Sequence, residues 1–104
     1  MHEEGEIDNM ADDLENRKKR LSFRSWHRGT REIDLILGRF ADHHLADFDE
    51  RMVDLYEKLL LNNDPDLYNW ISGAEQIPAN EESDVLKMLI DFNKRGGTIG
   101  ADGK

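Results

Sequence analysis

Between residues 17 and 95 the apolar side chains recur at helical spacing, and no stretch alternates between apolar and polar positions over a strand's length. Apolar residues at i, i+3, i+4 and i+7 lie on one face of an α-helix. Three segments follow this spacing: Ile33, Ile36, Leu37, Phe40; Met52, Leu55, Tyr56, Leu59; and Val85, Met88, Leu89, Phe92. The pattern predicts an all-α domain, a small bundle of five helices with short connections.

Capping and helix-breaking residues set the expected boundaries. A first short helix is expected from about Arg17 to Trp26, after which Gly29 breaks the helical path. A side-chain oxygen just before an apolar periodic segment marks a helix start, because it accepts a hydrogen bond from the first turn. On this basis the next four helices are expected to have caps at Thr30, Asp47, Asp64 and Asn80. Gly73 is expected to end the fourth helix.

The two ends of the chain lack the helical pattern. Residues 1–16 carry few large apolar side chains and a single sign of charge, which predicts an acidic disordered tail. Residues 96–104 are rich in glycine and are expected to form a flexible tail. One helical domain over residues 17–95 is therefore expected in this chain of 104 residues.

The formal net charge of −9 is distributed unevenly. Residues 1–16 hold seven acidic and no basic residues, residues 17–31 hold seven basic and no acidic residues, and residues 32–104 are acidic again. The basic segment has three interpretations: a nucleic-acid site, arginines paired with the acidic helices of the same fold, or a docking surface for a protein. The acidic flanks repel a polyanion at long range, which makes nucleic acid the weakest of the three.

The sequence offers little chemistry of its own. It contains no cysteine, which excludes disulfides, thiolate metal sites and cysteine nucleophiles, and its glycines form no phosphate loop between a strand and a helix. His43 has i, i+4 spacing from Asp47, as two metal ligands on one helix face would, but the sequence offers no obvious third ligand for a metal ion. We therefore expect no catalytic residues, no metal and no stably bound cofactor.

Charge and hydropathy also bear on where the protein works. The longest apolar run is Leu59-Leu60-Leu61, so no transmembrane helix is expected. The acidic residues 1–6 resemble neither a secretory signal nor an arginine-rich transit peptide. These observations favour a bacterial cytoplasmic protein, and we expect it to be a monomer.

The run Arg28-Gly29-Thr30-Arg31-Glu32 lies where the first two predicted helices meet. Glycine there permits a sharp turn with a bare surface, which would bring Arg28 and Glu32 together on an exposed corner. Alternatively, Gly29 merely ends a helix and Glu32 is an acid favoured by the helix dipole of the next one. From the residues alone the second interpretation is preferred.

This run resembles the RGxxE motif of the SdhE family of succinate dehydrogenase flavinylation factors, called succinate dehydrogenase assembly factor 2 in mitochondria. The resemblance extends to the segments around the motif and covers about residues 20–94. The flanking segments 20–27 and 33–41 resemble the family's first two helices, and 55–60 its third. The run Asp64-Pro65-Asp66-Leu67-Tyr68-Asn69-Trp70-Ile71 resembles its aspartate-rich turn and aromatic fourth helix.

The resemblance implies a non-enzymatic assembly factor. Such a protein binds the flavoprotein subunit of succinate dehydrogenase, and in bacteria also that of fumarate reductase. It promotes covalent FAD attachment there by stabilising a conformation competent for flavinylation. The partner-binding residues that it implies are Arg28, Gly29, Glu32, Arg31, Asp34, Asp64, Asp66 and Trp70. Trp70 is equally a candidate for the core.

Two other functions remain open at this point. One is a small acidic helical adaptor for an unrelated protein, and the other is a nucleic-acid binder that uses residues 17–31.

Overall fold

The computed structural model describes the backbone of residues 2–96 and the side chains of residues 13–96. This part of the chain contains helices and connections but no strand, which confirms the predicted all-α, five-helix fold. In chain order the elements are α1 (His2–Trp26), α2 (Arg31–His44), the 3-10 helix η1 (Leu45–Asp47), α3 (Glu50–Leu59), α4 (Asp64–Ser72), the 3-10 helix η2 (Ala79–Glu81) and α5 (Asp84–Lys94).

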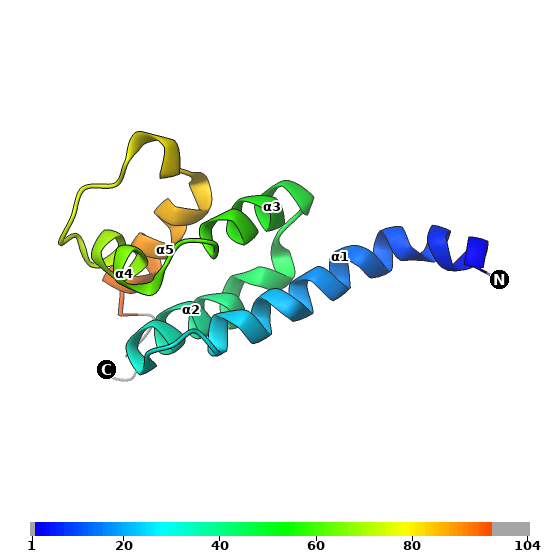
Figure 1. The fold of residues 1–104 in the computed structure, drawn as a ribbon, viewed down its shortest axis with the longest axis horizontal. Helices are drawn as coiled ribbons and strands as arrows, with labels where there is room; N and C mark the ends of the chain where they lie inside the picture. Colours follow the sequence, from blue (N-terminus) through cyan, green and yellow to red (C-terminus); the bar gives the residue numbers. More distant parts are fainter. Residues whose placement is uncertain (1, 97–104) are drawn as a thin grey trace.

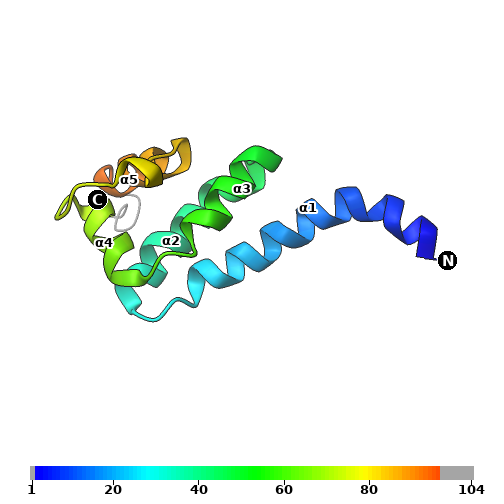
Figure 2. The same ribbon diagram turned by 45° about the horizontal axis from the view of Figure 1, so that its top comes forward.

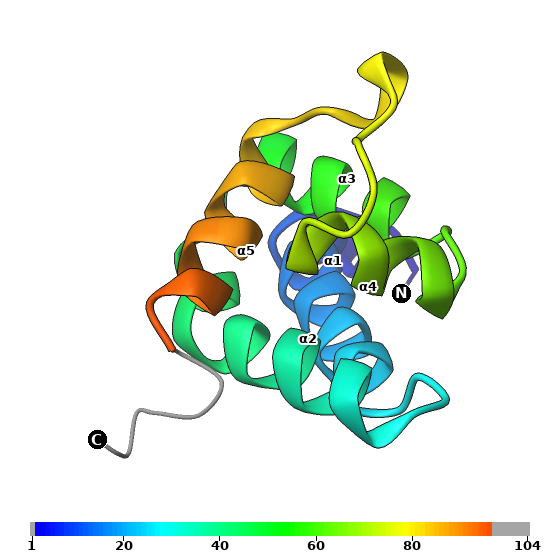
Figure 3. The same ribbon diagram turned by 90° about the vertical axis from the view of Figure 1, so that its left-hand side faces the viewer.

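Helix α2 runs back along α1, and α3, α4 and α5 lie together on one side of this pair, with α3 against α1 and α5 against α2 (Figure 1). The N-terminal half of α1 extends beyond the rest of the bundle, as the rotated view also shows (Figure 2). Viewed from the end, the helices surround one core (Figure 3). None of the described helices has the length and apolar composition that crossing a membrane requires.

Helix α1 begins at His2, well before the expected start near Arg17, so residues 2–16 differ from the disordered tail that we expected over 1–16. Two contacts secure the middle of this helix. Leu14 packs against the core, and the guanidinium of Arg17 donates to Asp54 at 2.5 Å and to Glu57 at 2.8 Å. Of the expected flexible tail over residues 96–104, all but Gly96 lies outside the described residues.

The helix boundaries test the predicted caps. The side chain of Thr30 caps α2 as predicted, because its Oγ1 accepts a hydrogen bond from the Ile33 amide at 3.3 Å. Gly73 ends α4 as predicted, with a positive φ of 86° that glycine adopts without strain.

Three predicted caps were wrong by one to three residues. The residues that cap α3, α4 and α5 are Asp49, Asn63 and Ser83. The predicted caps Asp47 and Asn80 instead lie in η1 and η2, the short 3-10 turns that precede α3 and α5. Such turns delay the start of the following helix.

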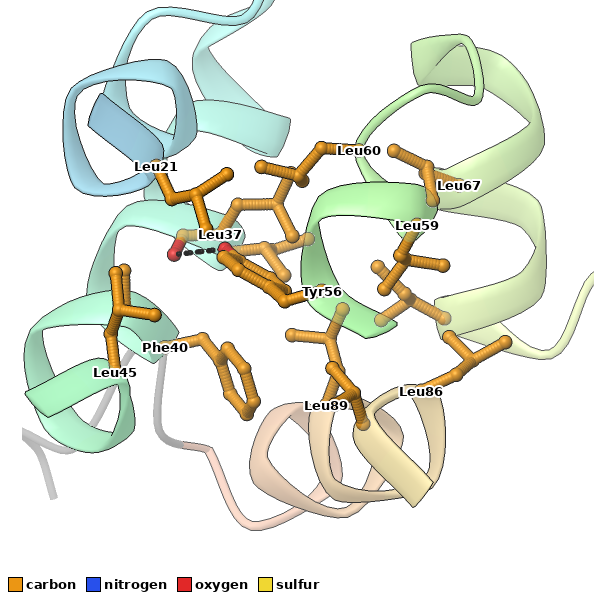
Figure 4. Packing of buried hydrophobic residues seen from close by; sticks show 14 of the residues in the cluster. Leu21, Leu37, Phe40, Leu45, Tyr56, Leu59, Leu60, Leu67, Leu86 and Leu89 are labelled. Carbon is orange, nitrogen blue, oxygen red and sulfur yellow. Dashed lines mark hydrogen bonds between the residues drawn. The ribbon is translucent and has the colours of Figure 1, made fainter. Parts of the chain in front are cut away.

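Tyr56 lies at the centre of the core, between α1, α2 and α3 (Figure 4). Its hydroxyl is 2.6 Å from the hydroxyl of Ser25 and donates to the carbonyl of Leu37 at 3.5 Å. Burial raises the pKa of the Tyr56 phenol, so that it stays neutral. The one buried phenol therefore links three helices while keeping its polar atom hydrogen-bonded.

Helices α1 and α2 approach each other closely at Gly38. A Cβ atom added at Gly38 would overlap the indole ring of Trp26, so the absence of a side chain on α2 makes room for that ring. The indole nitrogen of Trp26 donates to Asp42 at 3.2 Å. This contact fixes the last turn of α1 against α2 and so positions the connection that follows.

Replacing Gly38 by alanine should destabilise the protein. Overpacking of a close contact lowers the free energy of unfolding by about 1–3 kcal/mol. At an exposed helix position, by contrast, alanine raises it by about 1 kcal/mol relative to glycine. Urea denaturation should show a lower midpoint for Gly38→Ala. In a Trp26→Leu background, which removes most of the overlapping ring, the penalty should shrink or reverse. An equal penalty in both backgrounds would contradict the assigned contact.

Candidate functional site

The motif recognised in the sequence forms the connection between α1 and α2, and we call residues 28–32 the α1–α2 corner. The corner lies beside the start of α4 (Figure 2). Gly29, Thr30, Arg31 and Glu32 are exposed, whereas Arg28 is largely buried.

The side chain of Arg28 points inward, away from the exposed surface that the first interpretation of this run would have it share with Glu32. Its guanidinium donates to Asp64 Oδ1 at 2.9 Å, to the carbonyl of Leu60 at 2.8 Å and to the carbonyl of Asn62 at 2.7 Å. The side chains of Arg28 and Asp64 are only 13% and 19% exposed. These three hydrogen bonds, the Arg28 clamp, fasten the end of α1 to the turn between α3 and α4.

The backbone of the corner is fixed as well. The Arg28 amide donates to Asp34 Oδ1 at 2.6 Å, a short bond to a carboxylate within the first turn of α2. Together with the Thr30 cap, this bond holds both ends of the connection in one conformation. Asp34 is half-buried and positions the corner from inside.

Gly29 is required for space rather than for an unusual backbone conformation. Among the described glycines only Gly73 and Gly96 have positive φ. A Cβ atom at Gly29 would lie 2.9 Å from Asp64 Oδ2, closer than real Cβ contacts allow. A side chain at this position therefore displaces the carboxylate that holds Arg28.

Two hollows flank the clamp, and Asp64 lines both. The first has a volume of about 310 Å³ and a mainly apolar wall, with lining residues Thr30, Glu32, Ile33, Asp64, Pro65 and Tyr68. The second has a volume of about 340 Å³ and is lined by Arg24, His27, Arg28, Asn63 and Asp64. Both are open at the surface, so a partner has access to either side of the corner.

The structure divides the sequence-predicted site residues into three groups. Exposed at the corner are Gly29, Arg31 and Glu32. Arg28, Asp34 and Asp64 form the supports beneath it. Asp66 is half-buried in the first turn of α4, and Trp70 is 6% exposed and packs in the core, as its alternative interpretation held.

Tyr68 was not singled out from the sequence, although it is 42% exposed and lines the first hollow. The sequence did contain a signal for Tyr68: its i+4 spacing from Asp64 places both residues on one face of α4. Among the described side chains no group of three His, Cys, Asp or Glu residues is placed to hold a metal ion.

Removing the Arg28 clamp should destabilise the protein strongly. Arg28→Ala leaves a mostly buried carboxylate and two carbonyls without their donor, and breaking such a pair costs about 3–5 kcal/mol. Arg28→Lys keeps the charge but cannot make all three bonds, so its loss should be intermediate. The measurement is the free energy of unfolding in urea. Arg51→Ala, which breaks an ion pair whose side chains are about 60% exposed, is the matched control and should barely move the midpoint. Equal effects of Arg28→Ala and Arg51→Ala would refute the clamp.

Comparison with known proteins identifies the family. Residues 19–93 match the model of a family described as "Flavinator of succinate dehydrogenase". The chain is 40% identical over 78 residues to succinate dehydrogenase assembly factor 2-B, mitochondrial, of Drosophila mojavensis, covering 73% of this chain and 50% of the relative. It is 36% identical over 83 residues to succinate dehydrogenase assembly factor 2, mitochondrial, of Dictyostelium discoideum, covering 80% and 59%. The chain thus spans about half the length of the curated relatives that it matches.

The relatives correct the expected location. Both are named as mitochondrial proteins and come from eukaryotes, which contradicts the expectation of a bacterial cytoplasmic protein. That expectation depended on the acidic character of residues 1–6, and this feature does not distinguish the two settings.

The matched segment contains the α1–α2 corner, the clamp and all five helices except the first part of α1 and the last residue of α5. The chain therefore belongs to the family of flavinators of succinate dehydrogenase.

Proposed function

We propose that this chain is a non-enzymatic assembly factor that binds the flavoprotein subunit of succinate dehydrogenase and promotes covalent attachment of FAD to it. The observation that supports this most is the match of residues 19–93 to the flavinator family. The geometry adds that Gly29, Arg31 and Glu32 lie at one exposed corner, which the hydrogen bonds of Arg28 to Asp64 and Asp34 support. The names of the relatives suggest a mitochondrial setting.

In this proposal the chemistry belongs to the client flavoprotein, which carries both the FAD and the residue that becomes linked to it. The assembly factor binds one arrangement of the client's domains more tightly than another and so shifts their populations. A preference of about 1.4 kcal/mol changes the ratio of two populations tenfold. In the favoured arrangement the reacting groups are held close enough to react.

A corner that is already rigid suits this task. Little conformational entropy remains to be lost there on binding, because the Arg28 clamp, the Asp34 contact and the Thr30 cap fix its backbone. The absence of a side chain at Gly29 lets the client's surface approach the backbone. The carboxylate of Glu32, beside the apolar hollow, is available for a charge-assisted contact.

The supporting residues have a different role from Glu32. Arg28, Asp34 and Asp64 position the corner, while Glu32, Arg31 and the Gly29 backbone contact the client. Asp66 adds negative charge at the edge, in the first turn of α4.

Glu32→Ala should greatly reduce covalent flavin on the client without loss of stability. The test co-expresses the flavoprotein subunit with each variant, denatures the product and measures flavin fluorescence in the gel. Glu50→Ala is a matched control, because Glu50 is also an exposed acid in the first turn of a helix. If Glu32 serves only to stabilise the helix dipole, the Glu32→Ala and Glu50→Ala variants will both keep full flavinylation. That result would refute a contact between the Glu32 carboxylate and the client.

Gly29→Arg should abolish flavinylation while leaving the helical circular dichroism intact. The new side chain covers the bare backbone and displaces Asp64, but the core residues lie away from it. A folded and fully active Gly29→Arg protein would show that the corner is not the docking site. If the unaltered chain raises no covalent flavin at all, the function itself must be replaced by that of a general adaptor.

A further inference from the structure

Six of the seven basic residues over residues 17–31 fall into two sets, and the seventh, Arg31, is exposed at the α1–α2 corner. One set faces inward: Arg17 pairs with acids on α3, Lys18 donates to the carbonyl of Ala46 at 2.9 Å, and Arg28 forms the clamp. Pairing of the basic segment with the chain's own acidic helices therefore accounts for only part of its charge.

The other set faces outward. Lys19 and Arg20 are exposed and Arg24 is half-buried, and none of these three side chains makes a hydrogen bond or an ion pair with another described residue. Phe23 lies among them with 63% of its surface exposed, and its ring stacks on His27 with centroids 4.0 Å apart and planes at 21°. At about 100° per residue these five positions span roughly 140° of the helix circumference. We call Lys19, Arg20, Phe23, Arg24 and His27 the α1 basic face.

This face combines features that are typical of a protein contact. Arginine and aromatic residues are the usual energetic anchors of interfaces. The second hollow, which Arg24 and His27 help to line, lies at the C-terminal end of the face and offers space for a partner's carboxylate beside Arg24. Because the hollow also borders Arg28, the face is continuous with the α1–α2 corner.

Charge complementarity indicates the chemistry of the partner. The chain carries a net charge of −9, and the segments before and after residues 17–31 are acidic. An acidic partner is therefore repelled by most of the molecule and attracted at this face, so that the face both accelerates the encounter and orients it.

We propose that the α1 basic face docks an acidic segment of the client flavoprotein, as a second contact that adjoins the corner. This inference depends on the proposed function, because it names the chemistry of the same client. The corner supplies the contact that selects the client's conformation, and the α1 basic face supplies most of the association rate.

A charge-reversal pair of variants tests the proposal. The test variant is Lys19→Glu/Arg20→Glu/Arg24→Glu. The matched control is Lys58→Glu/Lys87→Glu/Lys94→Glu, which changes the net charge equally at exposed lysines on α3 and α5. Both variants should keep the helical circular dichroism, because none of these side chains belongs to the buried core.

The measurement is the rate of association with the purified flavoprotein subunit over a range of ionic strength. The face variant should associate about tenfold or more slowly than the unaltered chain at low salt, and the rate should no longer fall as salt is added. The control should slow much less and keep its salt dependence. Phe23→Ser should leave the association rate nearly unchanged and raise the dissociation rate severalfold.

The other outcomes each overturn the inference in a recognisable way. If the unaltered chain binds the subunit but both charge variants behave alike, the α1 basic face is not a docking surface, while the proposed function stands. If the unaltered chain does not bind the subunit, both fail. If the unaltered chain and the control variant bind labelled single-stranded RNA and the face variant does not, the face is a nucleic-acid site. If the unaltered chain and the control variant sediment as dimers and the face variant sediments as a monomer, the face binds a second copy of the chain.

Discussion

The guanidinium of Arg28 joins two parts of the chain that are far apart in sequence. Arg28 lies two residues after the end of α1, and its three hydrogen bonds reach the residue that follows α3, the connection to α4 and the first residue of α4. A lysine cannot replace it, because only a planar fork with several donors satisfies one carboxylate and two carbonyls at once. This domain has no cysteine to form a disulfide, and it depends on such a contact to keep an exposed corner in one conformation.

The same contact explains why the neighbouring positions are constrained. Asp64 accepts from Arg28 through one oxygen and lies against Gly29 with the other, so glycine is the residue that leaves the carboxylate in place. Asp64 also lines both hollows. The residues that support the corner thus shape its surface, although Glu32 is the side chain left free to contact a partner.

The sequence predicted the helices well where periodicity carried the information. Ile33, Ile36, Leu37 and Phe40 were expected on one face of a helix, and all four are buried. The caps were predicted less well, because several Asp, Asn and Ser residues compete for each of them. The 3-10 turns η1 and η2 decide the caps of α3 and α5.

The inward orientation of the Arg28 side chain could not be predicted from the periodicity and spacing of the sequence. Two of its three acceptors are backbone carbonyls, 32 and 34 residues away, and a backbone carbonyl has no signature in the residue type. Charge counting was similarly limited: it identified residues 17–31 as basic, whereas the fold determines which of these cations are paired and which are exposed. At the N-terminus, an acidic segment that composition alone assigns to disorder continues α1 in the structure.

Amide hydrogen exchange of the chain, alone and bound to the flavoprotein subunit, tests the docking corner most directly. The first-turn amides of α2, at Arg31 and Glu32, have no acceptor within the helix and should exchange rapidly in the free chain. Strong slowing at residues 29–32 in the complex is the expected result. Slowing confined to the connection between α4 and α5, with residues 29–32 unchanged, would contradict docking through the α1–α2 corner.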